Sequence, residues 1–195
     1  MMRLAWIIPL FLLCGASPAD ENQAALQKVE RFAYQLQKFN VDEAAKSSAQ
    51  MLVTDLQTDD GRLSNEQVKQ LQVMPDGKRR LVLAYLSIGE AEDYRPYWKP
   101  QWKKSPPAWL GPENPDWEGN YKVRYWDEGW QKLILGSPHA SLDQILDAGF
   151  DGVYLDIVDG FEYWQEHGQA DAAAKMVAWV KTIADYARSK RPGFI

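Results

Sequence analysis

The sequence contains few residues that could form disulfides or bind metals. Among its 195 residues are one cysteine, Cys14, and two histidines, so a disulfide framework is excluded. Neither His139 nor His167 has a second histidine or a cysteine at the spacing that metal sites use, and we therefore expect no metal. Lys and Arg number 22 against 27 Asp and Glu. Because nucleic acids require a basic surface, we also expect no nucleic-acid partner.

Signature motifs of two large classes of enzyme are absent as well. The sequence has no glycine-rich phosphate loop, which argues against nucleotide binding. It has no Gly-x-Ser-x-Gly motif, and no other motif assembles a Ser-His-Asp triad. What remains is a chain with 46% hydrophobic, 25% charged and 12% aromatic residues. That composition is typical of one globular domain, long enough to bury a sizeable core.

The first 19 residues have the features of a secretory signal peptide. A basic start is followed by an apolar run over residues 4–14 and then by small residues up to Ala19. The run is too short to span a bilayer and contains Pro9, so a membrane anchor is not expected. We expect cleavage after Ala19, with Ala16 as the alternative, and a domain over residues 20–195.

Cys14 offers a second route for export, as the lipid-bearing residue of a lipoprotein. Leu13 argues against it, because a small residue is expected before such a cysteine. By either route the folded domain has no cysteine, and loss of Arg3 changes its formal net charge from −5 to −6. We therefore expect an acidic domain that is secreted or periplasmic, with no membrane contact after cleavage.

Apolar and amphipathic segments alternate along the chain. Four apolar runs with strand-forming residues predict strands over residues 32–36, 51–56, 81–88 and 152–158. Two of these runs, 81–88 and 152–158, are almost continuously apolar, as parallel strands buried on both faces are. Helical periodicity or capping signals predict helices over residues 42–48, 64–73, 141–149 and 170–190. This alternation predicts an α/β fold with a parallel sheet.

The four predicted strands are half the number in a (β/α)8 TIM barrel. A (β/α)8 TIM barrel needs about 200 residues at minimum and about 250 typically. Only about the first half of such a barrel fits here, and Phe194-Ile195 would open a fifth strand. One hypothesis is therefore an N-terminal fragment of a longer protein, which we expect to be unstable and inactive alone. The alternative is a small open α/β sheet that is complete at this length.

Two predicted strands end in a carboxylate, at Glu90 and at Asp156. In parallel α/β folds, catalytic groups gather at this edge of the sheet. Asp156 is the stronger candidate because it directly follows a buried apolar run. An ionised carboxylate there is unfavourable unless it is paired or has a catalytic role. The alternative is that Asp156 caps the following turn or pairs with Arg95. Glu92, Asp93 and Arg95 are expected to form a solvated or locally paired loop.

A long loop rich in aromatic residues follows the third predicted strand. Loops of this length in compact domains are usually functional, and flat aromatic faces beside carboxylates suit sugar rings. We expect most of these tryptophans to fasten the loop to the domain and two or three to touch a ligand. Tyr125 and Trp126 are the best candidates, since residues 121–126 form a short extended run. The tryptophans of the loop are Trp98, Trp102, Trp109, Trp117, Trp126 and Trp130.

Three segments together resemble one family. They are Tyr-Leu-Ser-Ile-Gly-Glu-Ala-Glu-Asp-Tyr-Arg at 85–95, Asn-Tyr-Lys-Val-Arg-Tyr-Trp at 120–126 and Gly-Phe-Asp-Gly-Val-Tyr-Leu-Asp at 149–156. The chain resembles glycoside hydrolase family 114, the endo-α-1,4-polygalactosaminidase-like TIM barrels, in its bacterial and archaeal extracellular branch. The resemblance implies hydrolysis of α-1,4-linked galactosamine polysaccharide without a cofactor. Asp156 matches the family's catalytic Asp, whereas the family's second carboxylate, a Glu on a later strand, has no counterpart here.

Two hypotheses of different classes follow. The first is an exported glycosidase with Asp156 as one of two catalytic carboxylates, acting on a polysaccharide that is a cationic amino-sugar polymer. An acidic cleft would attract such a polymer. The second is a non-catalytic carbohydrate-binding barrel protein. The residues expected to bind substrate are Glu90, Asp159, Tyr85, Tyr125 and Trp126.

Overall fold

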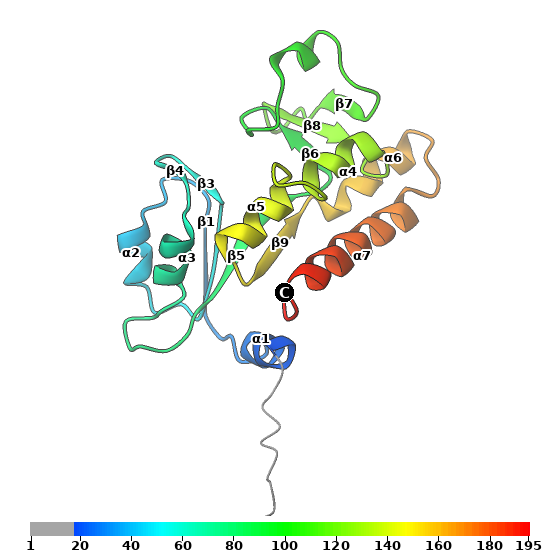
Figure 1. The fold of residues 1–195 in the computed structure, drawn as a ribbon. Helices are drawn as coiled ribbons and strands as arrows, with labels where there is room; N and C mark the ends of the chain where they lie inside the picture. The colour runs from blue at the N-terminus through cyan, green and yellow to red at the C-terminus, as the bar shows by residue number, and fades with distance from the viewer. Residues whose placement is uncertain (1–17) are drawn as a thin grey trace, which may run out of the picture.

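The structure, a computed structural model, describes residues 18–195. Apart from its last two residues, the predicted signal peptide lies outside the described residues, and so does Cys14. The centre of the fold is a parallel sheet with the strand order β1-β2-β5-β9 (Figure 1). Its strands are β1 (Phe32–Gln35), β2 (Met51–Thr54), β5 (Leu81–Ser87) and β9 (Gly152–Asp156). All four lie within the predicted runs, so the prediction of a parallel α/β sheet is confirmed.

Helices pack on one face of this sheet. Val82, Ala84 and Leu86 of β5 share one buried cluster with Leu142 and Ile183 from two of the helices. These side chains alternate along the strand with Leu83, Tyr85 and Ser87, which point to the opposite face. The helices that follow the predicted pattern are α2 (Val41–Ala45), α3 (Asn65–Leu71), α5 (Ser141–Ala148) and α7 (Ala172–Lys190). The sequence did not predict α1 (Pro18–Leu26).

Local signals set the ends of two of these helices. Ser64 accepts a hydrogen bond from the backbone N–H of Gln67, whose side chain in turn accepts from the Ser64 N–H. This capping box starts α3 where the sequence predicts it. Gly149 ends α5 in the left-handed region, at φ 92°, which a glycine adopts without strain. The chain then turns directly into β9.

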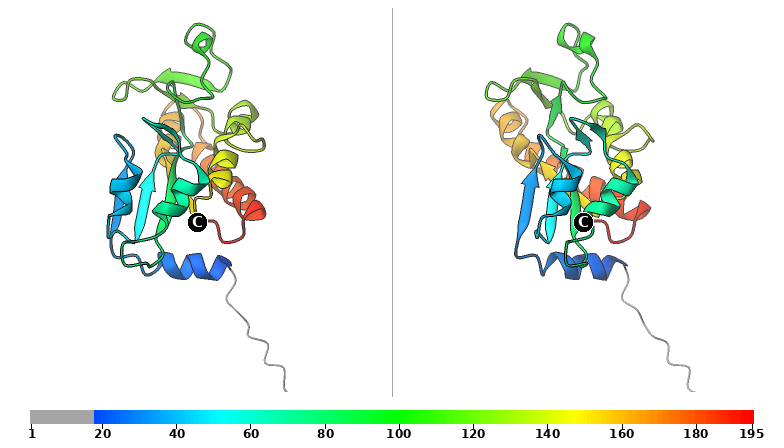
Figure 2. Two further views of the ribbon diagram at one scale, coloured as in Figure 1. Left: turned by 60° about the vertical axis from the view of Figure 1, so that its left-hand side comes forward. Right: turned by 90° about the vertical axis from the view of Figure 1, so that its left-hand side faces the viewer.

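The loop after β5 contains structure of its own. It holds an antiparallel sheet of β6 (Glu90–Glu92), β8 (Asn120–Val123) and β7 (Leu110–Glu113), in that order, and the short helix η1 (Pro100–Lys103). In both views of Figure 2 this sheet stands at one end of the molecule and α1 at the other. The sequence predicted only the extended run that became β8. Helix α4 (Glu128–Ile134) follows, started by the Asp127 carboxylate, which accepts from the Gly129 N–H at 2.7 Å.

The remaining elements are short. A hairpin of β3 (Gln57–Thr58) and β4 (Gly61–Arg62) follows β2, while η2 (Val158–Gly160) and α6 (Phe161–Glu166) follow β9. Ile195 exchanges two backbone hydrogen bonds with the β9 region, to Asp151 and from Val153, each at 3.0 Å, as a neighbouring parallel strand would. Residues 18–195 form four parallel strands of four to seven residues each. A closed eight-stranded barrel stays a prediction. Within residues 18–195, no helix is long and apolar enough to cross a membrane.

Candidate active site

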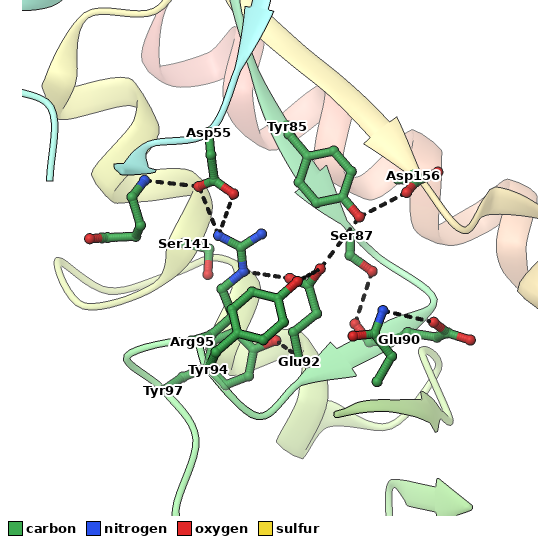
Figure 3. A network of polar contacts seen from close by, with 12 residues as sticks. Asp55, Tyr85, Ser87, Glu90, Glu92, Tyr94, Arg95, Tyr97, Ser141 and Asp156 are labelled. Atoms are coloured by element: carbon green, nitrogen blue, oxygen red, sulfur yellow. Dashed lines mark hydrogen bonds and ion pairs between the residues drawn. The ribbon is translucent and has the colours of Figure 1, made fainter. Parts of the chain in front are cut away.

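Asp156 lies at the carboxyl end of β9, beside the end of β5. The strand register pairs Tyr85 with Tyr154 and Ser87 with Asp156, so Tyr85 and Asp156 point to the same face of the sheet. The Tyr85 hydroxyl donates a hydrogen bond to Asp156 Oδ2 at 2.8 Å (Figure 3). Asp156 itself is half-buried. Its second carboxylate oxygen has no hydrogen-bond partner among the described residues and is free to meet a ligand.

A buried ionic cluster adjoins this pair. Arg95 donates from Nε to Glu92, and its Nη1 lies 2.7 Å from the carboxylate of Asp55, just beyond β2. The side chains of Arg95, Glu92 and Asp55 are only 13%, 3% and 9% exposed. The prediction for this segment was a solvated or a locally paired loop. The solvated form is wrong for Glu92 and Arg95, which are buried, whereas local pairing is confirmed, because Arg95 pairs with Glu92 three residues earlier as well as with Asp55. The predicted alternative, a pairing of Arg95 with Asp156, is not what the structure shows.

Tyrosine hydroxyls join the cluster to Asp156. Tyr94 donates to Glu92 Oε1 at 2.7 Å, and the Tyr85 oxygen lies 3.4 Å from the same atom. Since Glu92 is already bonded by Tyr94 and Arg95, the single Tyr85 proton goes to Asp156. Burial and the charges of Glu92 and Asp156 raise the pKa of Tyr85 well above its ordinary range. Tyr85 thus stays a neutral donor at any physiological pH.

The cluster and Asp156 together carry more negative than positive charge. Three carboxylates, those of Asp55, Glu92 and Asp156, share one guanidinium, that of Arg95. Burial lowers the pKa of Arg95, but the hydrogen bond to Asp55 and the charge of Glu92 more than offset this and raise it. Arg95 is therefore permanently charged. Even so, the group has a net negative charge when its carboxylates are ionised, which favours a cationic ligand.

A strained backbone position follows Asp156. Ile157 adopts the left-handed conformation, at φ 57° and ψ 37°, which is rare for a β-branched residue. Its carbonyl oxygen packs against Gly89, where an added Cβ would lie 2.2 Å away. The Ile88 N–H also donates to the Asp156 carbonyl at 3.1 Å. Strain of this kind concentrates at functional sites, and here it fixes the direction in which the chain leaves Asp156.

Glu90, predicted to bind substrate or to support the site, lies among donors from the loop after β5. Its side chain is fully buried, and its carboxylate accepts from Lys122 at 2.5 Å, from Asn114 at 2.9 Å and from Asn120 at 3.4 Å. A carboxylate with these three donors binds the β7–β8 region rather than solvent or a substrate. Asp159, in η2, is exposed and lies three residues after Asp156.

Tyr125 and Trp126 pack against the helices after β9. Tyr125 is fully buried, and its hydroxyl donates to the Ala172 carbonyl at 2.7 Å. Burial raises its pKa to about 12. The Trp126 ring meets Trp164 edge-on, with centroids 5.5 Å apart, and lies 4.8 Å from the Lys175 ammonium. The structure does not bring either residue into contact with Tyr85, Glu92 or Asp156.

The other tryptophans of the loop form an interlocked row. Trp98 and Trp102 meet edge-on at 5.3 Å, Trp102 and Trp109 at 5.1 Å, and Trp109 packs on Trp130 at 5.4 Å. This confirms the expectation that most of them fasten the loop to the domain. Trp117 stands apart, at 68% exposure.

A pocket of about 520 Å³, which includes space open to solvent, adjoins the ionic cluster. Within residues 18–195, no three His, Cys, Asp or Glu side chains are grouped so that they could hold a metal ion. The residues that line the pocket include Asp55, Gln57, Tyr85, Ser87, Glu92, Arg95, Tyr97, His139 and Ser141.

Asp55 was not among the residues predicted for this group. The signal was present, because Asp55 directly follows the apolar strand β2 just as Asp156 ends β9. The same rule that selected Asp156 selects Asp55. No comparable signal marked Glu92, because most of its neighbours in the sequence are polar and do not predict a buried carboxylate.

Comparison with known proteins identifies relatives of this chain. A protein of Methanocaldococcus jannaschii is 46% identical over 164 residues, which are 82% of this chain and 45% of that protein. A protein of Thermotoga maritima is 35% identical over 97% of this chain and 58% of its own length. Neither has an assigned function in its name. The chain thus spans about half the length of the curated relatives it matches.

Two solved structures share the fold. The crystal structure of Aspergillus fumigatus Ega3 in complex with galactosamine has a TM-score of 0.59 at 22% identity and covers 84% of this chain and 57% of that one. The glycoside hydrolase domain of PelA from Pseudomonas aeruginosa has a TM-score of 0.58 at 17% identity, with 84% and 56% covered. The model of glycoside-hydrolase family GH114 matches residues 15–194. The chain therefore belongs to glycoside-hydrolase family GH114.

Proposed function

We propose that this protein is an exported glycoside hydrolase that cleaves α-1,4-linked, galactosamine-containing polysaccharide with a pair of carboxylates. Family membership supports the reaction class. The observation that carries the proposal is Asp156, a half-buried carboxylate at the carboxyl end of β9 with one oxygen fixed by Tyr85 and the other free. In parallel α/β folds this edge is where catalytic side chains gather.

Asp156 acts directly on the sugar in this proposal. The hydrogen bond from Tyr85 to Oδ2 holds the carboxylate in one orientation. In a retaining reaction the free oxygen attacks the anomeric carbon while a second carboxyl group protonates the departing glycosidic oxygen, and water then hydrolyses the glycosyl ester. Glycosidases need a second carboxyl group, about 5–5.5 Å away in retaining and about 6.5–9.5 Å away in inverting enzymes. The resemblance assigns that role to a Glu on a strand later than β9.

Glu92 does not suit the role of second carboxylate. It is 3% exposed, and both of its oxygens are engaged, one by Arg95 and the other by Tyr94. A proton donor must reach the leaving oxygen of the substrate, and a carboxylate held in this way cannot. Glu92 is better suited to hold Arg95, whose guanidinium lies 5.7 Å from the centroid of the Tyr85 ring.

The charge of the site supports a cationic substrate. Asp55, Glu92 and Asp156 outnumber Arg95, and the predicted mature chain has a formal charge of −6, from −5 less one arginine. The negative charge of the site and that of the whole chain would both attract an amino sugar with a free ammonium group. The galactosamine complex of Ega3, a structural relative, is consistent with this choice.

The test compares two polymers with the full-length natural protein. One is α-1,4-linked galactosamine polymer with free amino groups, and the other is the same polymer fully N-acetylated. New reducing ends should form on the first polymer and much more slowly on the second, and added salt should raise KM for the first. Equal rates on both polymers would refute the electrostatic argument. Binding of the first polymer without cleavage would favour a non-catalytic carbohydrate-binding protein instead.

A further inference from the structure

The turn between β7 and β8, residues 114–120, displays Trp117 to solvent. The Trp117 side chain is 68% exposed, while the other tryptophans of the long loop are buried or half-buried. A single exposed aromatic residue is common on protein surfaces. Trp117 differs because the turn that carries it is held in one shape by a buried charged group.

Glu90 is that group. Its fully buried carboxylate accepts from Asn114 and Asn120, the two ends of the turn, and is neutralised by Lys122. The Asn114 N–H also donates to the Asn120 carbonyl at 2.7 Å, which closes the turn. Burying an ionised carboxylate is unfavourable unless it is paired and hydrogen-bonded. These contacts satisfy the buried carboxylate and fix both ends of the turn. Trp117, in the middle of the turn, carries the exposed indole.

The residues beside Trp117 are acidic. Asp116 and Glu118 are both exposed, and neither forms an ion pair with any of residues 18–195. The turn therefore exposes an indole whose two neighbours in the sequence are exposed carboxylates. An amino sugar matches this surface, because its ring has an apolar C–H face and its ammonium group is a cation.

The turn belongs to the same structural unit as the candidate active site. Glu90, which anchors the turn, and Glu92, which contacts Tyr85, are both on β6. Figure 1 shows β6, β7 and β8 beyond the end of β5, on the side to which its carboxyl end points. A polymer with one sugar at Asp156 has further sugars that can reach other parts of this end of the molecule.

We propose that the turn 114–120 is an accessory subsite for an amino-sugar polymer. One ring stacks on the Trp117 indole, and its ammonium group pairs with Asp116 or Glu118. The subsite binds a sugar at a distance from the reacting bond, so it contributes to the affinity for long chains and not to the bond-breaking step. The inference rests on the proposed function and adds a residue-level binding site to it.

The first experiment measures hydrolysis by the full-length natural protein and its Trp117→Ala and Trp117→Phe variants. Substrates are the α-1,4-linked galactosamine polymer and oligomers that are too short to span both sites. Trp117→Ala should raise KM for the polymer about three- to tenfold, the contribution of one aromatic contact. The kcat should not change, short oligomers should be unaffected, and Trp117→Phe should retain part of the affinity.

The second experiment separates stacking from charge. The double variant Asp116→Asn/Glu118→Gln should weaken binding of the polymer at low salt and have little effect at high salt. Its matched control is Glu21→Gln/Glu30→Gln, which removes two exposed carboxylates near the opposite end of the sheet. The control should bind the polymer as the wild type does.

The outcomes distinguish the subsite from the function on which it rests. If the wild type cleaves the polymer and Trp117→Ala has the same KM for polymer and oligomers as the wild type, the subsite is refuted and the function stands. If the wild type neither cleaves nor binds the polymer, both are refuted. Equal losses of affinity in the two double variants would refute the role of Asp116 and Glu118. Thermal melts of each variant show that it is folded, as expected for changes at exposed side chains.

Discussion

Replacing Arg95 by methionine should strongly destabilise the protein. Methionine keeps most of the aliphatic volume of the side chain but removes the guanidinium between Asp55 and Glu92. These two carboxylates are 9% and 3% exposed, so neither can recover its lost partner from water. The variant leaves two buried negative charges close together with no cation between them.

The structure sets the size of the effect. Removal of one partner from a buried ion pair destabilises a protein by about 3–5 kcal/mol, because the remaining charge stays buried and unpaired. Here Asp55 retains a hydrogen bond from the Gln57 N–H at 2.8 Å, and Glu92 retains one from Tyr94. We therefore expect the lower part of that range, about 3 kcal/mol, a large share of the stability of an ordinary domain. Arg95→Lys keeps the charge and should lose less, since an ammonium cannot bond both carboxylates in the same forked geometry.

Urea denaturation of the full-length protein measures the free energy of unfolding of each variant. The control is Lys46→Met, which breaks an ion pair with Glu43 whose two side chains are 69% and 73% exposed. Exposed pairs contribute little, so this control should unfold like the wild type. If Arg95→Met and Lys46→Met had the same stability, the cluster would not be a buried, charge-dependent unit, and the reasoning would be refuted.

Three further predictions use other parts of the structure. Arg80 is fully buried and donates to the carbonyls of Ala49 and Leu71, so Arg80→Met should lower the free energy of unfolding by about 3 kcal/mol, seen as a lower urea midpoint. Gly89→Ala would place a Cβ 2.2 Å from the carbonyl oxygen of the residue after Asp156. It should reduce both thermal stability and hydrolysis, and unchanged values for both would contradict the proposed close packing. The pKa of Tyr125 is raised in the folded protein to about 12, so its stabilising effect is complete below pH 10 and is lost between about 10 and about 12. In an alkaline titration, the absorbance that is lost in a Tyr125→Phe variant should appear near pH 12 and not near pH 10, and its appearance near pH 10 would contradict the burial of this hydroxyl.

The sequence predicted the parallel sheet well because its signals are local. The runs that became β2, β5 and β9 are mostly apolar and each contains a valine. Ser64 and Gly149 mark helix ends by their own chemistry. The antiparallel sheet β6-β8-β7 was not predicted. Its strands are short, contain Pro112 and several charged residues, and are stabilised by contacts with distant segments.

The candidate site was predicted in part. Asp156 follows from its place at the end of an apolar strand, and Tyr85 precedes the end of the neighbouring strand. Glu92 and Arg95 have the polar composition of a surface loop, and their burial goes together with ion pairs and hydrogen bonds that the composition does not reveal. The choice among the aromatic residues was equally difficult, since composition does not distinguish the buried Tyr125 from the exposed Trp117.

The central claim is that Asp156 is a catalytic carboxylate. The most direct measurement is hydrolysis and binding of α-1,4-linked galactosamine polymer by full-length protein with Asp156→Asn, which keeps the shape of the side chain and removes its charge. The account predicts a loss of turnover by orders of magnitude while the protein still binds the polymer. Full hydrolysis by Asp156→Asn would contradict it.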